Sequence, residues 1–178
     1  MKVVTAVEDV DRSGISPYDV KVFLAGGISN CRNWQNKVID ILSHKPETER
    51  LVVFNPRREN FPIYDSNAAK EQIEWEFYSL LRADIFSVYF CNSESVQPIT
   101  FYELGRNVTR MDHLYGRNAC DHIVVSVENG FSRTRDVVIQ TGLVIDDALK
   151  SGCIITDSTP QKHADRIYEL YKKEVSKI

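Results

Sequence analysis

The sequence predicts one α/β domain in which a central, mostly parallel, five-stranded sheet is covered by helices on both faces. Short apolar runs of strand length alternate with longer segments of helical periodicity. Chains that alternate in this way form parallel sheets with right-handed crossovers. With 178 residues, of which 43% are hydrophobic, the chain is long enough for one domain with a substantial core.

The predicted strands are short apolar runs that end at glycine, asparagine or charged residues. Residues 1–19, which contain two turn signals, are expected to be an N-terminal extension, and residues 20–178 the domain itself. The strands are expected at residues 20–25, 51–54, 85–90, 123–127 and 154–156.

The predicted helices fill the intervals, at about residues 32–43, 67–82, 100–109, 136–150 and 160–175. In the second helix, four apolar residues at helical spacing predict the buried face: Ile73, Phe77, Leu80 and Leu81. Glu76 lies at the edge of this stripe, so we expect it to lean over a cleft beside the core. The plain alternative is a rim glutamate in a surface salt bridge.

Composition and charge exclude several classes of function. The net charge of −3 gives no electrostatic footprint for a nucleic-acid polymer. No apolar run approaches the roughly 20 residues that span a bilayer, and no signal-peptide core is present, so we expect a cytoplasmic protein without a membrane partner. The four cysteines are far apart and the four histidines are scattered, so neither a metal site nor a disulfide framework is expected.

Glu103 follows the third predicted strand, in the segment PITFYELG at residues 98–105. Ligands of open α/β sheets bind beyond the carboxyl ends of the strands, where this residue is expected to lie. The segment from Thr100 to Glu103 also fits a capping box. A helix start favours negative charge, so Glu103 is expected to be ionised at neutral pH, as a nucleophile toward a sugar carbon must be. Because both interpretations need Glu103 at this position, position alone does not distinguish a helix cap from a nucleophile.

The loop after the first strand contains Gly26, Gly27, Ser29 and Asn30. Glycines let a ligand approach the backbone, and the polar residues could hold a sugar or a phosphate. A plain tight turn is the alternative, and the pattern is not a dinucleotide fingerprint.

Further candidates are charged residues near strand ends. Arg57, Arg58 and Arg106 could contact a phosphate through their planar guanidinium groups, although arginines are more often solvated. Asp84 opens the third strand and is either a structural turn residue or a site residue.

Five ordered motifs resemble those of the nucleoside 2-deoxyribosyltransferase family, and most closely its divergent deoxyribosyltransferase-like branch. They are FLAGGI at 23–28, NPRR at 55–58, QIEWE at 72–76, AD at 83–84 and ITFYELGR at 99–106. The resemblance spans about residues 20–127. It implies a flavodoxin-like three-layer sandwich that acts on the N-glycosidic bond of a small-molecule nucleoside, or of a nucleotide in hydrolase relatives, without a cofactor.

The resemblance also assigns roles to individual residues. The family's nucleophile lies in its E-L-G motif, which makes Glu103 the nucleophile. Its second acid lies eight positions before the aspartate of the A-D pair, which is Glu76 here, and helps to protonate the leaving base. Asp84 and Tyr102, within the matched motifs, are further candidate substrate contacts.

Two positions depart from the family pattern. Gln97 stands where many members have a second substrate-anchoring acid, and it could still bond a sugar hydroxyl. Val22 and Phe23 occupy the strand where many members have a tyrosine whose hydroxyl steadies the nucleophile.

The resulting hypothesis is a retaining transfer of a 2-deoxyribosyl group through a covalent bond to Glu103. The alternatives are hydrolysis of a deoxynucleotide or another nucleotide by the same nucleophile, and a non-catalytic nucleotide-binding module. The family resemblance also implies a homo-oligomer, because the loop after the fourth strand can complete a neighbouring subunit's site.

Overall fold

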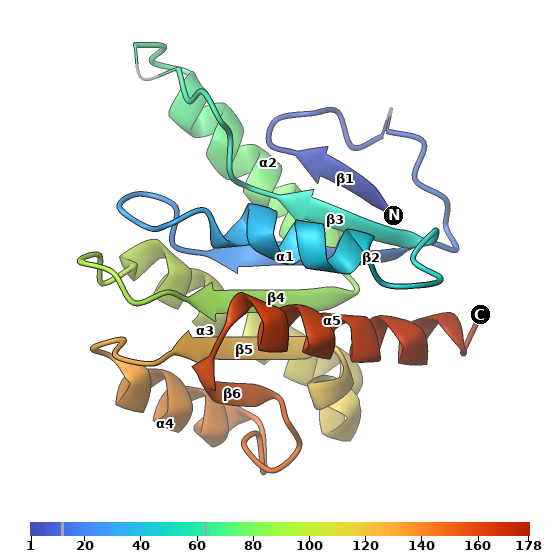
Figure 1. Cartoon of the computed structure of the whole chain (residues 1–178), viewed down its shortest axis with the longest axis vertical. Helices are drawn as coiled ribbons and strands as arrows, with labels where there is room; N and C mark the ends of the chain where they lie inside the picture. The colour runs from blue at the N-terminus through green and yellow to red at the C-terminus, as the bar shows by residue number, and fades with distance from the viewer. Residues whose placement is uncertain (12, 63) are drawn as a thin grey trace.

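The computed structural model describes residues 1–11, 13–62 and 64–178 and confirms an α/β fold with a parallel sheet (Figure 1). The strands run in the order β1-β3-β2-β4-β5-β6, and every neighbouring pair is parallel. Without β1 this is the flavodoxin-like order, in which the sheet is extended in both directions from β2. The strands are β1 (Lys2–Thr5), β2 (Val20–Gly26), β3 (Leu51–Asn55), β4 (Ile85–Phe90), β5 (Ile123–Glu128) and β6 (Ile154–Ser158).

Helices cover both faces of the sheet. The core on one face is formed with α1 and α5, and the core on the other with α2, α3 and α4. The helices are α1 (Trp34–Ser43), α2 (Ala68–Arg82), α3 (Pro98–Tyr115), α4 (Thr134–Val144) and α5 (Pro160–Val175), with a short 3-10 helix, η1 (Gly116–Asp121), after α3. Within the described residues, no helix is both long and apolar enough to cross a membrane.

The sheet has six strands rather than the five predicted, because Lys2–Thr5 forms an edge strand. It pairs in parallel with β3, from Lys2 opposite Val52 to Thr5 opposite Asn55. After it, the Trp75 indole N–H donates to the carbonyl of Glu8 at 2.9 Å. A four-residue strand that begins with lysine and ends with threonine has little periodic signal, and only its non-local partner stabilises it.

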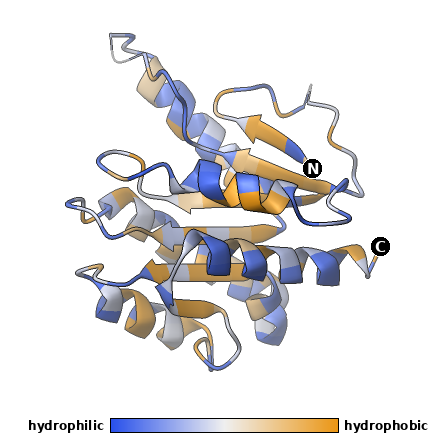
Figure 2. Cartoon of the chain, viewed as in Figure 1, coloured by the Kyte–Doolittle hydropathy of each residue, from blue (hydrophilic) through white to orange (hydrophobic). Residues whose placement is uncertain are grey.

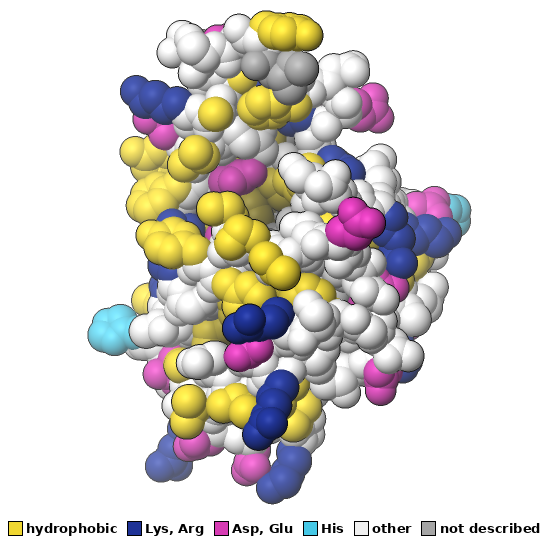
Figure 3. Space-filling view, turned by 90° about the vertical axis from the view of Figure 1, so that its left-hand side faces the viewer, with side chains coloured by type: hydrophobic (Ala, Val, Ile, Leu, Met, Phe, Trp, Pro, Cys, Tyr) yellow, Lys and Arg dark blue, Asp and Glu magenta, His cyan; other side chains and the backbone are white. Residues whose placement is uncertain are grey.

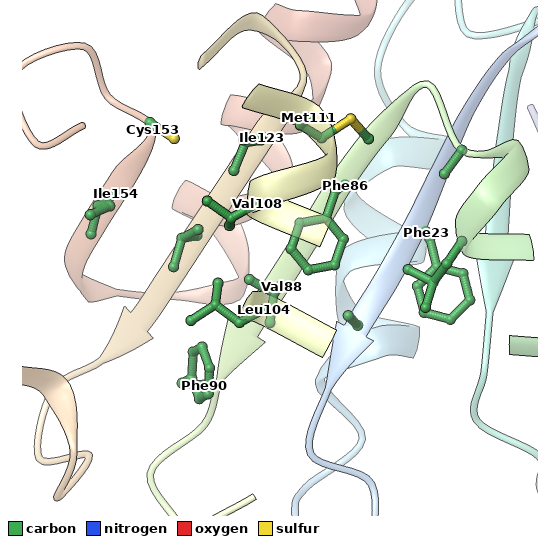
Figure 4. Packing of buried hydrophobic residues seen from close by; sticks show 14 of the residues in the cluster. Phe23, Phe86, Val88, Phe90, Leu104, Val108, Met111, Ile123, Cys153 and Ile154 are labelled. Atoms are coloured by element: carbon green, nitrogen blue, oxygen red, sulfur yellow. The ribbon is translucent and has the colours of Figure 1, made fainter. Parts of the chain in front are cut away.

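The central strands alternate their side chains between the two cores. In β2, Val22 and Leu24 pack on the α1 and α5 side, whereas Phe23 and Ala25 pack on the other side. The strands are accordingly the most apolar part of the chain (Figure 2). Figure 4 shows the second core, where Leu104 and Val108 of α3 lie against the strands.

The predicted buried face of α2 is wrong. Ile73 is 64% exposed, Phe77 41% and Leu81 46%, and only Leu80 of the predicted stripe is buried. Trp75 takes the core position instead, with its ring 6.2 Å from those of Phe23 and Phe54. Burial of the larger indole outweighs the aliphatic stripe, so the helix is rotated and its apolar stripe faces outward.

One polar link crosses the α1 and α5 core. His163 of α5 is fully buried and hydrogen-bonds Ser87 of β4 at 2.7 Å and Ser126 of β5 at 2.8 Å. Burial lowers the pKa of His163 to about 3, so the ring is neutral and each nitrogen has a partner. The link fixes α5 across two neighbouring strands.

We expect this histidine to make stability fall with acid. Below about pH 6.5 His163 is protonated in the unfolded chain, whereas in the folded chain it stays neutral until about pH 3. The unfolded state is therefore favoured as the pH falls through this range. His163→Gln should therefore reduce the slope of the unfolding free energy between pH 4.5 and 6.5 by up to about 1.4 kcal/mol per pH unit, measured by urea unfolding. The exposed His44, changed to Gln, is the control. An unchanged slope in His163→Gln would contradict the buried neutral ring.

Candidate active site

A cavity of about 300 Å³ opens at the carboxyl edge of the sheet, beside the ends of β2 and β4. The strand order reverses direction here, which is where open α/β sheets bind ligands. Figure 3 views this edge, which is hollowed near its middle, with hydrophobic side chains gathered beside the hollow. The cavity is lined by Phe23, Ala25, Gly26, Gly27, Ile28, Ser29, Pro56, Glu76, Ser95, Gln97, Pro98, Ile99, Thr100 and Glu103.

Glu103 projects into this cavity from the second turn of α3. The helix begins at Pro98, whose fixed φ suits a first helical position, and Gln97 precedes it in a left-handed conformation (φ 52°). The predicted capping box is therefore wrong, because Thr100 and Glu103 lie inside the helix and no acidic residue occupies the first turn. The carboxyl group of Glu103 is thus free of any capping role.

Glu76 reaches the same cavity from α2. The side-chain amide of Gln72, one turn earlier, donates to Glu76 Oε1 at 2.7 Å and to the carbonyl of Pro56 at 2.6 Å. Gln72 therefore orients the carboxyl group and ties it to the chain after β3. Glu76 lies near the cleft as predicted, although the stripe used to place it faces solvent.

The electrostatics of the cavity favour retention of a proton. Burial, and then the nearby Glu76, raise the pKa of Glu103 to about 8, while Arg106 opposes the shift. Burial also raises the pKa of Glu76, against the hydrogen bond from Gln72. The prediction that Glu103 is ionised at neutral pH is therefore wrong for this structure, because desolvation outweighs the helix dipole. The two groups interact, so they titrate as a pair.

Gln97 braces the cavity wall. Its Oε1 accepts from the amide of Gly27 at 3.1 Å, and its Nε2 donates to the carbonyl of Cys91 at 2.8 Å. A Cβ at Gly27 would lie 2.8 Å from this amide, so a larger residue there would break the contact. Gln97 lines the cavity, but both ends of its amide are bonded to the backbone.

Arg57 is a second brace rather than a cavity residue. Its guanidinium donates to the carbonyls of Ile28 at 3.0 Å, Cys31 at 3.1 Å and Arg32 at 3.2 Å, and its Nε to Gln35 at 2.9 Å. These bonds hold the loop after β2 in place. The guanidinium predicted to contact a phosphate is thus bonded to the protein's own backbone.

The other predicted residues are divided between the cavity and the surface. Gly26, Gly27 and Ser29 line the cavity as a group. The three candidate arginines lie outside the cavity lining, and so do three further predicted residues: Asn30, Asp84 and Tyr102.

Each of these three has a different environment. Asn30 is exposed with a left-handed φ of 57°. Tyr102 is 66% exposed and lies against Arg106. Asp84 lies at the opposite, amino edge of the sheet, where it accepts from the Lys21 amide at 2.8 Å and the Lys21 ammonium at 2.9 Å.

Sequence reasoning missed several apolar and hydroxyl residues of the wall, among them Ile28, Pro56, Ser95 and Ile99. Three of them lie within the family-like motifs FLAGGI, NPRR and ITFYELGR, and Ser95 follows the third predicted strand by a few residues, but as apolar or small side chains they gave no chemical signal. Phe23 forms part of the wall and offers no hydroxyl to either carboxyl group.

The fold and the cavity together define a flavodoxin-like α/β protein with two carboxyl groups in a cavity at the carboxyl edge of its sheet. The family model described as nucleoside 2-deoxyribosyltransferase like matches residues 19–116, more than half of the chain and the part that contains every lining residue. The chain belongs to this nucleoside 2-deoxyribosyltransferase-like family, as the sequence motifs indicated. No match was found among curated proteins.

We expect the carboxyl pair to be visible in a titration. In ¹³C-labelled protein, the Glu103 carboxyl should titrate with a midpoint near pH 8. Glu76→Gln should lower that midpoint, because it removes a repelling charge, but burial should keep it above the ordinary 4.5. Glu74→Gln, on the exposed side of α2, is the matched control and should change nothing. A wild-type midpoint below about 5 would contradict the buried pair.

Proposed function

We propose that this protein cleaves the N-glycosidic bond of a 2-deoxynucleoside and transfers the deoxyribosyl group to a second base or to water. One observation carries the proposal: Glu103 and Glu76 reach the same cavity from two different helices. Membership of the family supports the same chemistry. A pair of carboxyl groups is the minimum that cleavage with retention requires, one as nucleophile and one as acid.

In the proposed reaction, Glu103 attacks the anomeric carbon while the bond to the base breaks. Glu76, or a water that it binds, gives a proton to the departing base. The sugar is then held by a covalent bond to Glu103 until a second base or a water molecule displaces it. Every step uses side chains that line the cavity.

This reaction needs an ionised Glu103 and a proton available to the base. The pair already retains a proton near neutral pH, but Gln72 stabilises the charge on Glu76 rather than on Glu103. A sugar hydroxyl that donates to Glu103 would reverse this distribution, because a hydrogen bond to the charged form lowers the pKa. Substrate binding would thus supply the donor that Phe23 lacks.

The cavity favours a nucleoside over a nucleotide. Among the described residues, its only ionisable lining side chains are the acidic Glu76 and Glu103. A 5′-phosphate would bring about two negative charges close to these carboxyl groups. Arg57, the predicted phosphate contact, is bonded to the backbone of the loop. The start of α3 offers only a partial positive charge.

Chromatography with a panel of substrates tests the reaction. Wild-type protein should release base from deoxynucleosides and exchange it when a free base is added. Its kcat/KM should fall as the pH rises through about 8, because the carboxyl pair then loses the proton that the departing base needs. Glu103→Gln should lower kcat by about 10³-fold or more, and Glu76→Gln by about 10²-fold. Glu74→Gln is the control. The 5′-monophosphates should have the lower kcat/KM.

The panel also has outcomes that count against the proposal. Equal base release by Glu103→Gln and wild type would exclude the nucleophile. Binding of a nucleoside in calorimetry without any base release would favour a non-catalytic binding module.

We also propose that the protein is a homo-oligomer that associates through the outward face of α2 and the start of α3. The face contains exposed apolar residues that a monomer would leave in water: Ile73, Phe77, Tyr78, Leu81 and Ile99. Hydrophobic side chains gather beside the hollow in Figure 3. Ile99 belongs both to this face and to the cavity wall, so association would border the site.

Light scattering on a sizing column tests the association. The wild type should elute as an oligomer, and Phe77→Glu should elute as a monomer because it places a charge in the contact. Leu143→Glu, a similar change of an exposed residue on α4, is the control. A monomeric wild type at micromolar concentration would contradict the proposal.

A further inference from the structure

The four cysteines, which are far apart in the sequence, form two pairs in which each thiol influences the pKa of the other. Cys31 and Cys91 lie at the carboxyl edge, where Cys31 Sγ is 3.3 Å from Ser93 Oγ and Cys91 Sγ accepts from Gln97 Nε2 at 3.7 Å. Cys120 and Cys153 lie at the amino edge, where η1 leads into β5 and the following loop leads into β6, and the hydroxyl of Ser151, two residues before Cys153, contacts Cys120 Sγ at 3.0 Å. All four are free thiols.

The surroundings of Cys120 stabilise a thiolate. The hydroxyl of Ser151 donates to Cys120 Sγ at 3.0 Å. Arg166 of α5 brings a positive charge: its Nη2 donates to the carbonyl of Ser151 at 3.3 Å, and its Nη1 pairs with the exposed Glu169. The Nε of Arg166 is buried and has no partner in the described residues.

The balance of charges around Cys120 favours ionisation. The neighbouring thiol of Cys153 has the largest effect, and with Ser151 and Arg166 it lowers the pKa of Cys120 to about 6, although burial opposes the shift. Asp121 opposes this shift, but it is paired with Lys173 at 2.8 Å. The neighbouring Cys120, and then burial, raise the pKa of Cys153, so Cys120 is the more acidic thiol of the two.

Accessibility also divides the pair into two roles. Cys120 is partly exposed and so open to a small reagent, whereas Cys153 is fully buried. The other pair has the opposite character. Burial and the contact with Cys31 raise the pKa of Cys91 to about 12, and Glu128 adds to the shift.

We propose that Cys120 and Cys153 form a thiol–disulfide exchange site for low-molecular-weight disulfides. The Cys120 thiolate attacks one sulfur of the reagent, which forms a mixed disulfide and releases one thiolate. The Cys153 thiol loses its proton to solvent and attacks the Cys120 sulfur, which forms an internal disulfide and releases the second thiolate. Two protein thiols are oxidised, and the disulfide of the reagent is reduced to two thiols.

The site goes beyond the proposed glycosidic reaction and is separate from it. It lies at the amino edge of the sheet, whereas Glu103 faces the carboxyl edge. The internal disulfide would join η1 to the segment before β6, and neither segment lines the cavity. Loss of one activity therefore predicts nothing about the other.

Reaction with dithiodipyridine at pH 6 tests the proposal. About half of Cys120 is then thiolate, whereas an ordinary thiol with a pKa of about 8.5 is ionised to about 0.3%. The lower nucleophilicity of the more acidic thiolate offsets about tenfold of this difference, so we expect Cys120 to react about tenfold faster than an ordinary exposed thiol. Thiopyridone should be released rapidly by Cys120 and then, in equal amount, by Cys153. Peptide mass spectrometry should find the two residues linked.

Matched variants separate the roles of the thiols. Cys120→Ser should abolish the rapid phase, Cys153→Ser should halve the release and leave a stable mixed disulfide, and Cys31→Ser should change neither. Ser151→Ala keeps all four thiols and should slow the rapid phase several-fold at pH 6, because the thiolate loses a donor. A link between Cys31 and Cys91 instead, or a rapid phase that persists in Cys120→Ser, would overturn the proposal.

Discussion

The pairing of β2 with β4 is the contact on which the site depends. Their parallel register, from Val22 opposite Ile85 to Gly26 opposite Tyr89, ends both strands at the same edge and brings their loops together. β3 pairs on the other side of β2. The connection after β2 therefore runs toward β3 and the connection after β4 runs toward β5, and a cavity remains between the two loops. Gln97 joins the loops through Gly27 and Cys91, and α3 begins at the next residue. The position of Glu103 follows from that start.

The site shows how a fold retains an unfavourable group. A glutamate in the first helical turn would be stabilised by the cap and the dipole, but Glu103 lies one turn farther in, is largely desolvated and faces another carboxyl group. Desolvation and the second carboxyl group both raise the free energy of the ionised form of Glu103, and neither improves the packing of the core. Carboxyl groups that line a cavity and have strongly shifted pKa values are typical of acid–base and nucleophilic sites. Such groups can gain or lose a proton near the working pH.

Polar residues predicted to bind ligand have mainly structural roles. Gln97 and Arg57 are committed to backbone carbonyls and amides of the loops that form the cavity. Asp84 fixes the amino end of β2 through Lys21. A buried polar side chain must satisfy its hydrogen bonds, and the nearest groups are those of the protein itself. Hydrogen-bonding capacity in the sequence does not distinguish a ligand contact from a brace, because both use the same atoms.

Local periodicity determined much of this protein: alternating strands and helices gave the α/β class, and the ordered motifs gave the family and the carboxyl groups Glu76 and Glu103. Only tertiary contacts decided the rest. The edge strand Lys2–Thr5 exists through its pairing with β3, α2 is rotated because Trp75 takes the core, and the four cysteines become two pairs. The pKa of Glu103 is likewise set by burial and by a neighbour 27 positions away in the sequence. Periodicity depends on residues that are neighbours in the sequence. The burial of a side chain and the electrostatic field at it depend on all residues that the fold brings close, however distant they are in the sequence.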